Sequence, residues 1–195
     1  MVPSLSIDLN TEQQLRLLEI ARESITLGLN THHALKVDPA NYRGVLTENL
    51  ASFVTLTLGG ALRGCIGSLT ATRPLVQDVA NAAFSAAFKD PRFSHLSEQE
   101  LESVLIEISV LSVPEPLNIN NEEELLSQLV PHRDGLVLED REHRATFLPK
   151  VWEQLPQAKI FLTQLKHKAG LPEDYWSDTL CIYRYRTHSF SETSQ

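Results

Sequence analysis

Arg63 and Cys65 are the residues whose types and spacing are best suited to chemistry. They alternate within the segment Leu62–Gly67, which is predicted to be the second strand of a hairpin. Alternate side chains of a strand share a face, so the Arg63 guanidinium could favour the thiolate form of Cys65. The segment therefore predicts a site in which Cys65 is a candidate nucleophile or redox thiol. The neighbouring candidate ligand contacts are Arg63, Gly64 and Gly67, because the glycines would let a ligand or another chain approach the backbone.

The register of the hairpin bears on this hypothesis. If residues 59–60 form a two-residue turn, Cys65 lies opposite Val54. By the same count Arg63 lies opposite Leu56, so the face that Arg63 and Cys65 share is largely apolar. The alternative interpretation of Cys65 is then a small, packed core residue, a role to which cysteine is well suited.

Three further residues belong to the candidate site. An arginine on an apolar face needs an acceptor or an anionic ligand, and Glu107 is the internal partner expected for Arg63. Arg92 is expected to pair with an acid or to face the site. His95 is a candidate base that could approach Cys65, and its alternative interpretation is a solvated loop residue.

Composition narrows the class of protein. Seventeen basic against 25 acidic residues give a net charge of −8 without a run of Lys or Arg, so a nucleic-acid partner is not expected. The N-terminal residues do not resemble a signal peptide, and no apolar run has the length of a membrane helix, which predicts a cytoplasmic protein. In a reducing compartment Cys65 and Cys181 would be thiols, with a bridge between them as the alternative. No zinc-ligand spacing or phosphate-binding loop is present, so neither a metal nor a cofactor is predicted.

The hydrophobic pattern predicts two similar halves after an amphipathic first helix, whose capping box is expected at Thr11–Gln14. Each half has a hairpin, two helical segments and a closing strand. In the first half the hairpin is expected at residues 52–58 and 62–67, the helices at 74–88 and from 97, and the closing strand at 104–111. In the second half the hairpin is expected at residues 135–139 and 144–148, the helices around 151–152 and at 159–169, and the closing strand at 180–186. We infer an α+β protein of two β-β-α-α-β halves whose strands form one largely antiparallel sheet or a partly closed barrel.

The chain length predicts a single domain over residues 1–195, because 195 residues with 42% hydrophobic content can bury one full core. Residues from about 1 to 45 are expected to contribute to a smaller α-containing N-terminal subdomain. Residues from about 46 to 190 would form the main α+β body, and residues 191–195 a flexible tail.

Four stretches form a recognisable set: Leu62–Gly67; Asp90–Phe93 with Glu107–Leu111; Asp134–Leu136 with Ala145–Pro149; and Lys168–Leu171. In them the chain resembles the AMMECR domain family, whose bacterial and archaeal members are called component A of the AmmeMemoRadiSam system. The resemblance covers roughly residues 21–186 and implies an α+β fold with a smaller subdomain. It also implies two partners, a Memo-like protein and a radical SAM protein. One departure is Pro131–Arg133, where a small turn residue would be expected.

Two functions remain open at this point. In the first, a small anionic ligand is bound or transformed at Leu62–Gly67, with Arg63 holding the anion and Cys65 attacking it or shuttling electrons. In the second, the same strand is part of a non-catalytic binding or assembly module that docks a partner protein. Cys65→Ser separates them, because it would abolish chemistry at the thiol and leave a docking surface nearly intact.

Overall fold

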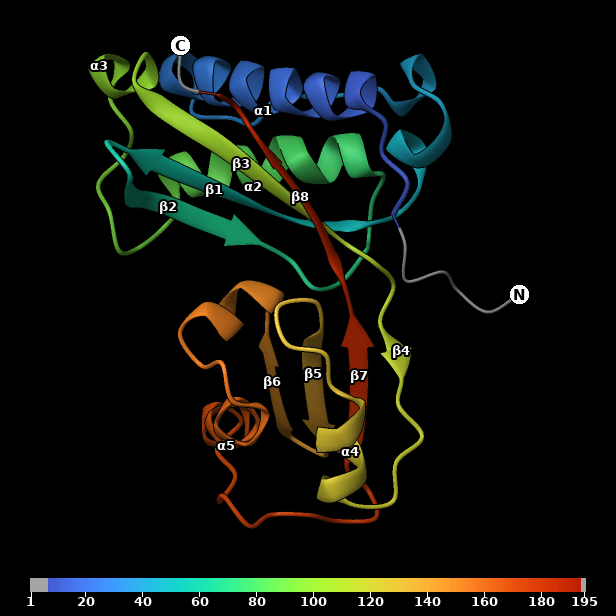
Figure 1. The fold of residues 1–195 in the computed structure, drawn as a ribbon. Helices are drawn as coiled ribbons and strands as arrows, with labels where there is room; N and C mark the ends of the chain where they lie inside the picture. The colour runs from blue at the N-terminus through green and yellow to red at the C-terminus, as the bar shows by residue number, and fades with distance from the viewer. Residues whose placement is uncertain (1–6, 194–195) are drawn as a thin grey trace. The chain divides into compact units, whose positions relative to one another are not determined.

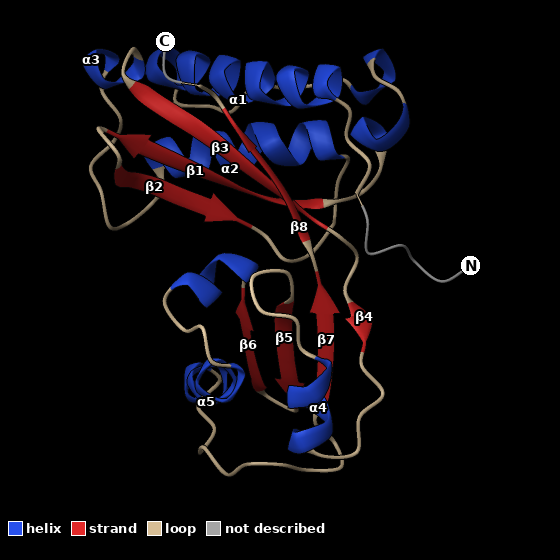
Figure 2. Cartoon of the chain, in the orientation of Figure 1, coloured by secondary structure: helices blue, strands red, loops and turns tan. Residues whose placement is uncertain are grey.

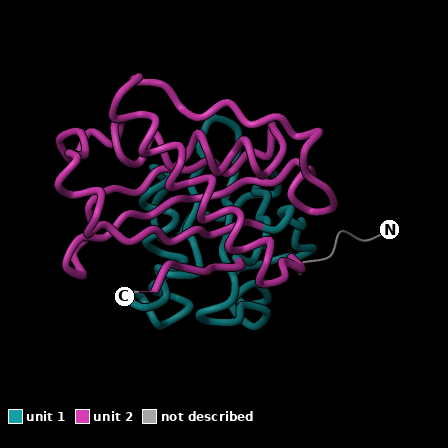
Figure 3. The backbone as a smooth tube through the Cα atoms, turned by 90° about the horizontal axis from the view of Figure 1, so that it is seen from above, with its two compact units in different colours: residues 1–6, 112–187 teal, residues 7–111, 188–195 magenta. Residues whose placement is uncertain are grey.

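The computed structural model describes residues 7–193, which divide into two compact units (Figures 1 and 3). The larger unit holds residues 7–111 and 188–193, and the smaller unit holds residues 112–187. Within the described residues, no helix combines the length and the apolar character needed to cross a membrane.

A four-stranded sheet forms the centre of the larger unit, with the strand order β2-β1-β3-β8. The strands are β1 (Ala51–Leu58), β2 (Ala61–Gly67), β3 (Val104–Leu111) and β8 (Thr187–Ser191). Two helices pack on this unit's sheet: α2 (Leu75–Phe88) on β1 and β2, and α1 (Thr11–Thr31) on α2 and β3 (Figure 1). Alternate residues of β1 and β3, such as Val54 and Ile108, are fully buried in the core beneath the helices.

Short helices complete the larger unit: η1 (Pro39–Asn41), η2 (Gly44–Thr47) and α3 (Glu98–Leu101). The capping box predicted at Ser97 is confirmed, because its side chain accepts from the Glu100 backbone and the Glu100 carboxylate accepts from the Ser97 backbone. The capping box of α1 begins one residue earlier than expected. Asn10 is the N-cap and exchanges hydrogen bonds with Gln13, since its side-chain oxygen reaches the third amide of the helix.

The smaller unit has its own four-stranded sheet, with the order β4-β7-β5-β6 (Figure 2). Its elements are β4 (Glu115–Pro116), α4 (Glu122–Gln128), β5 (Gly135–Asp140), β6 (His143–Phe147), η3 (Pro149–Glu153), α5 (Ala158–Lys168) and β7 (Cys181–Tyr185). The predicted hairpin is confirmed, with Asp140 paired with His143 across its turn. Two rings at the centre of this unit's core, Trp152 and Phe161, stack with centroids 3.9 Å apart.

The α+β class, the antiparallel pairing and the order of elements in both halves are confirmed. The strands form two separate sheets, however, instead of one sheet, and in the described residues neither sheet closes into a barrel. The separation occurs after Tyr185, where β7 ends one residue before the predicted end of the strand. The chain continues as β8, which belongs to the other sheet.

The compact units divide the chain after Leu111 and after Thr187. The helix α1 and residues 32–45 belong to the larger unit together with residues 46–111. The tail expected from residue 191 is structured in part, because Ser191 ends β8 and the Glu192 carboxylate forms an ion pair with Arg22. Residues 194–195 lie outside the described residues.

Candidate functional site

A β-bulge in β2 sets the geometry of the candidate site. Leu62 pairs with Thr57, but the next pair is Gly64 with Leu56, so Arg63 is an extra residue in the strand. Cys65 therefore lies opposite Thr55, and the expected pairing with Val54 is wrong. Because the bulge shifts the register by one residue, the expected alternation of Arg63 and Cys65 on one face is interrupted between them.

Gly64 packs so closely against α2 that a side chain at this position would not fit. A Cβ atom at Gly64 would lie 2.2 Å from the carbonyl oxygen of Ala86. The adjacent residue, Cys65, points to the other face of the sheet and is partly exposed. There the Thr55 hydroxyl donates a hydrogen bond to its sulfur over 3.3 Å, and both cysteines of the chain are free thiols.

Arg63 is buried and is held by a carboxylate. Its Nε and Nη2 atoms donate to the two oxygens of Glu100 over 2.6 and 3.1 Å, and Nη2 also donates to the His95 carbonyl over 3.3 Å. The guanidinium lies over the Phe93 ring, 5.8 Å from its centroid. This pairing raises the pKa of Arg63 and lowers that of Glu100 to about 2. The carboxylate that pairs with Arg63 here is therefore that of Glu100, whereas the sequence led us to expect Glu107.

A second ion pair covers the outer edge of β2. The buried carboxylate of Asp90 accepts from the Cys65 backbone N–H over 2.9 Å, and Arg92 donates to the Cys65 carbonyl over 3.3 Å. Arg92 also donates to both oxygens of Asp90, over 2.9 and 2.7 Å. These bonds hold the pKa of Asp90 well below its usual range. Asp90 and Arg92 thus take the place of a neighbouring strand at Cys65.

The remaining predicted residues lie around this arrangement. His95 is exposed, and its ring packs edge-on against Phe88 with centroids 6.0 Å apart. Its backbone carbonyl accepts a hydrogen bond from Arg63. Glu107 lies on β3 opposite Thr55. Gly67 ends β2, where a Cβ atom would lie 2.2 Å from the Ser52 carbonyl oxygen. Among the described residues, no group of three or more His, Cys, Asp or Glu side chains is placed to hold a metal ion.

The family of the chain follows from comparison with known proteins. Residues 18–190 match the family model AMMECR1. The chain belongs to the AMMECR1 family. It is 36% identical to protein MJ0810 of Methanocaldococcus jannaschii over 165 residues, 80% of each chain, and 37% identical to protein LS215_2104 of Saccharolobus islandicus, covering 95% of this chain and 84% of the relative.

A solved structure agrees with this assignment. The crystal structure of the uncharacterized protein PH0010 from Pyrococcus horikoshii superposes with a TM-score of 0.79 at 32% sequence identity, covering 91% of this chain and 90% of that one. The AMMECR1-type fold is therefore shown both by sequence and by structure.

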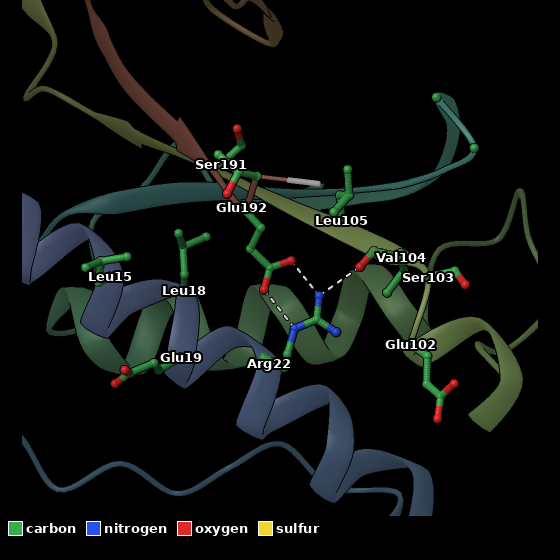
Figure 4. A pocket seen from close by; sticks show the side chains of 13 residues that line it. Leu15, Leu18, Glu19, Arg22, Glu102, Ser103, Val104, Leu105, Ser191 and Glu192 are labelled. Atoms are coloured by element: carbon green, nitrogen blue, oxygen red, sulfur yellow. Dashed lines mark hydrogen bonds and ion pairs between the residues drawn. The ribbon is translucent and has the colours of Figure 1, made fainter. Parts of the chain in front are cut away.

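The larger unit of this AMMECR1-family chain also contains a groove that the sequence analysis did not identify (Figure 4). Its volume is about 1040 Å³, and its lining includes Leu15, Leu105 and the ion pair of Arg22 with Glu192. Arg22 donates to Glu192 through Nε and Nη2 and to backbone carbonyls of residues 101 and 104. The ion pair therefore connects α1 to the C-terminal residues. The N–H groups of Arg22 donate to acceptors within the protein.

The residues that organise the AMMECR1-family site were in part missed from the sequence. Glu100 and Asp90 determine what Arg63 and Arg92 can do, and Thr55 is the polar neighbour of the thiol. The signal for Asp90 was its position in a turn, two residues before Arg92. Chemically, the arrangement offers a rigid strand with a partly exposed thiol, and its two nearby guanidinium groups are paired internally.

Proposed function

We propose that this AMMECR1-family protein acts in the cytoplasm as a non-catalytic binding component of a multi-protein pathway. Its surface around Leu62–Gly67 would dock a partner protein, and the family resemblance suggests Memo-like and radical SAM proteins as partners. The observation that carries the proposal is that both arginines near the thiol already have carboxylate partners, Arg63 with Glu100 and Arg92 with Asp90.

These ion pairs weigh against an anionic ligand at the same strand. The Nη1 atom of Arg63 is buried and has no hydrogen-bond partner among the described residues, so a ligand could contact it at one point. A ligand carboxylate or phosphate bound at two points would have to displace Glu100, whose carboxylate would then lose its hydrogen bonds to Arg63. The side chain of Arg63 is only 10% exposed, so the ligand would also lose its hydration on entering. Replacing one buried ion pair by another then leaves little net binding energy.

The same contacts favour docking of a protein. The Cys65 backbone donates to Asp90 and accepts from Arg92, which fixes its position, and Glu100 fixes the bulge next to it. A surface that is already rigid loses little conformational entropy on association. Leu62, which is 44% exposed, gives this surface an apolar anchor.

Calorimetric titration with a purified Memo-like protein, and then with a radical SAM protein, tests the proposal. We expect saturable binding to one of them that Leu62→Asp weakens at least about tenfold, because a charge would be buried at the contact. Ile160→Asp is the matched control, since Ile160 is similarly exposed, at 43%, but lies on α5. Absence of binding to both proteins, or equal weakening by both variants, would reject the docking surface.

A second candidate function is chemistry at the thiol, with or without an anionic ligand. It is favoured by the partial exposure of the free Cys65 thiol and by the polar contact that the Thr55 hydroxyl makes to its sulfur. The test is the rate of alkylation by iodoacetamide, compared with the exposed Cys181 in the same sample. Alkylation of Cys65 about tenfold faster than of Cys181 would support this candidate. Slower alkylation of Cys65 would support a binding role.

A further inference from the structure

Two arginines and one aspartate converge at the end of β7 in the smaller unit. Arg184 lies in β7 and Arg186 directly follows the strand end at Tyr185, and both side chains approach Asp134. Asp134, which is fully buried, lies between them, with Oδ1 3.7 Å from Nε of Arg186 and Oδ2 4.0 Å from Nη1 of Arg184. These separations are too long for hydrogen bonds, so Asp134 attracts each guanidinium group without a direct bond to it, while the two guanidinium groups repel each other.

The polar atoms at this cluster have incomplete hydrogen bonding. Asp134 Oδ2 accepts from the Val130 N–H over 2.9 Å. Its other oxygen, Oδ1, and the Nε atoms of Arg184 and Arg186 are buried without a hydrogen-bond partner among the described residues. Unsatisfied buried polar atoms are costly, and three of them at one place indicate that something else completes the network.

The charge of the cluster indicates what kind of group would complete the hydrogen-bond network. Two guanidinium groups face one carboxylate, which leaves one positive charge in excess. Glu115 lies opposite Arg184 in the pairing of β4 with β7, yet its carboxylate makes no ion pair with either arginine in the described structure. The side chains of Arg184 and Arg186 are 22% and 32% exposed, so solvent reaches part of each side chain although its Nε atom is buried.

We propose that Arg184, Arg186 and Asp134 form a binding site for a small oxyanion that also carries a hydrogen-bond donor, of which hydrogen phosphate is the simplest example. The guanidinium groups would donate to the oxyanion, as arginine does to phosphate in two-point fashion. The unpartnered Oδ1 of Asp134 would accept from the P–OH group. This site lies in the smaller unit and does not depend on the docking function proposed for β2.

The requirement for a donor distinguishes this site from general attraction of anions. Sulfate resembles phosphate in size and geometry but carries no proton at neutral pH, so its oxygens would face the lone pairs of Asp134 without a hydrogen bond. A site built from a buried polar group discriminates strongly against a ligand that leaves this group unpaired. We therefore expect the dissociation constant for phosphate to be at least about tenfold lower than that for sulfate.

The test is a titration of the full chain with inorganic phosphate, and separately with sulfate at matched ionic strength, followed by the NMR signals of the arginine Nε–H groups. Saturable shifts of the Arg184 and Arg186 signals are expected with phosphate. Arg144 provides an internal reference, since it lies on β6, is 54% exposed and has Glu139 as its partner at 3.7 Å. Shifts equal to those of Arg144, or equal responses to phosphate and sulfate, would overturn the proposal.

Variants give a second, independent measurement. Arg184→Gln and Arg186→Gln should each raise the dissociation constant for phosphate by about tenfold or more, whereas Arg144→Gln should leave it unchanged. Asp134→Asn should abolish the preference for phosphate over sulfate, because the amide can donate to either anion. A preference that survives in Asp134→Asn would overturn the assigned role of Asp134. The wild-type titration keeps the proposal testable if a variant does not fold.

Discussion

The carboxylate of Glu100 holds the guanidinium of Arg63 at two points, over 2.6 and 3.1 Å, while it also accepts hydrogen bonds from the backbone and hydroxyl of Ser97. One side chain thereby caps α3 and fixes the bulge of β2. This double use holds the Leu62–Gly67 strand in place and leaves Nη1, which is buried, as the one nitrogen of Arg63 without a hydrogen-bond partner among the described residues.

Replacing Glu100 should destabilise the larger unit strongly. In Glu100→Ala the buried guanidinium of Arg63 loses its counterion and α3 loses half of its capping box, at a cost of about 3 kcal/mol in the free energy of unfolding. Urea denaturation measures this change. Glu98→Ala is the control, since Glu98 is exposed on the same helix and should change stability by less than about 0.5 kcal/mol. Similar losses in both variants would contradict the account.

Stability should fall in acid because of the same carboxylates. The pKa of Glu100 is lowered from 4.5 to about 2, and that of Asp90 is lowered as well, so both groups favour the folded state when they are ionised. This contribution is complete above the ordinary carboxyl pKa and is lost as the pH falls from about 4.5 towards 2. Because Glu100 is partly exposed, we expect it to contribute about 2 kcal/mol.

The measurement is the unfolding free energy of wild type and Glu100→Gln as a function of pH. The difference between the two should be largest at neutral pH and should shrink below about pH 4.5, because the variant has no carboxyl group to titrate at this position. A difference that stays constant down to acidic pH would show that Glu100 does not carry this dependence.

Gly64→Ala should disrupt the packing of α2 on the sheet. The new Cβ would lie 2.2 Å from the Ala86 carbonyl oxygen, and a backbone atom cannot move aside as a flexible side chain can. We expect a loss of about 3 kcal/mol or failure to fold, as for severe overpacking of a core. Cys65→Ala, at the next position but on the other face, should cost less than about 1.5 kcal/mol. Thermal denaturation of both variants checks the contrast.

The hydrogen bond from Cys65 to Asp90 should protect the edge of β2 from local opening. In Asp90→Ala the Cys65 amide loses its acceptor, and its hydrogen exchange should accelerate by about tenfold to a hundredfold. The amide of Val54, in the neighbouring strand β1, should change much less. A uniform acceleration at both amides would indicate global destabilisation instead of an opened edge.

The order of the elements was predictable because it depends on local signals. The capping box at Ser97 and the glycine pair at residues 59–60 act within a few residues, and the structure has both features where the sequence placed them. The separation into two sheets was not predictable in this way. It depends on the transfer of the chain to another sheet after Tyr185, and no glycine or proline marks a break there.

The site was found by its residue types, but its geometry was not. The predicted segment is a strand in the expected hairpin, yet one extra residue at Arg63 moves Cys65 from Val54 to Thr55. The contacts at this bulge, Glu100 with Arg63 and Asp90 with Cys65, come from 37 and 25 residues away. Local pattern could not choose Glu100 over Glu107 as the partner of Arg63, because both are carboxylates near the same strand.

Protection of Cys65 from alkylation in a complex tests the docking surface most directly. The chain is treated with iodoacetamide alone and with a saturating Memo-like or radical SAM protein, and labelling of each cysteine is followed by peptide mass spectrometry. We predict that one partner slows labelling of Cys65 at least about tenfold and leaves the exposed Cys181 unchanged. Unchanged labelling of Cys65 in a saturated complex would show that partners bind elsewhere and would contradict the proposed function.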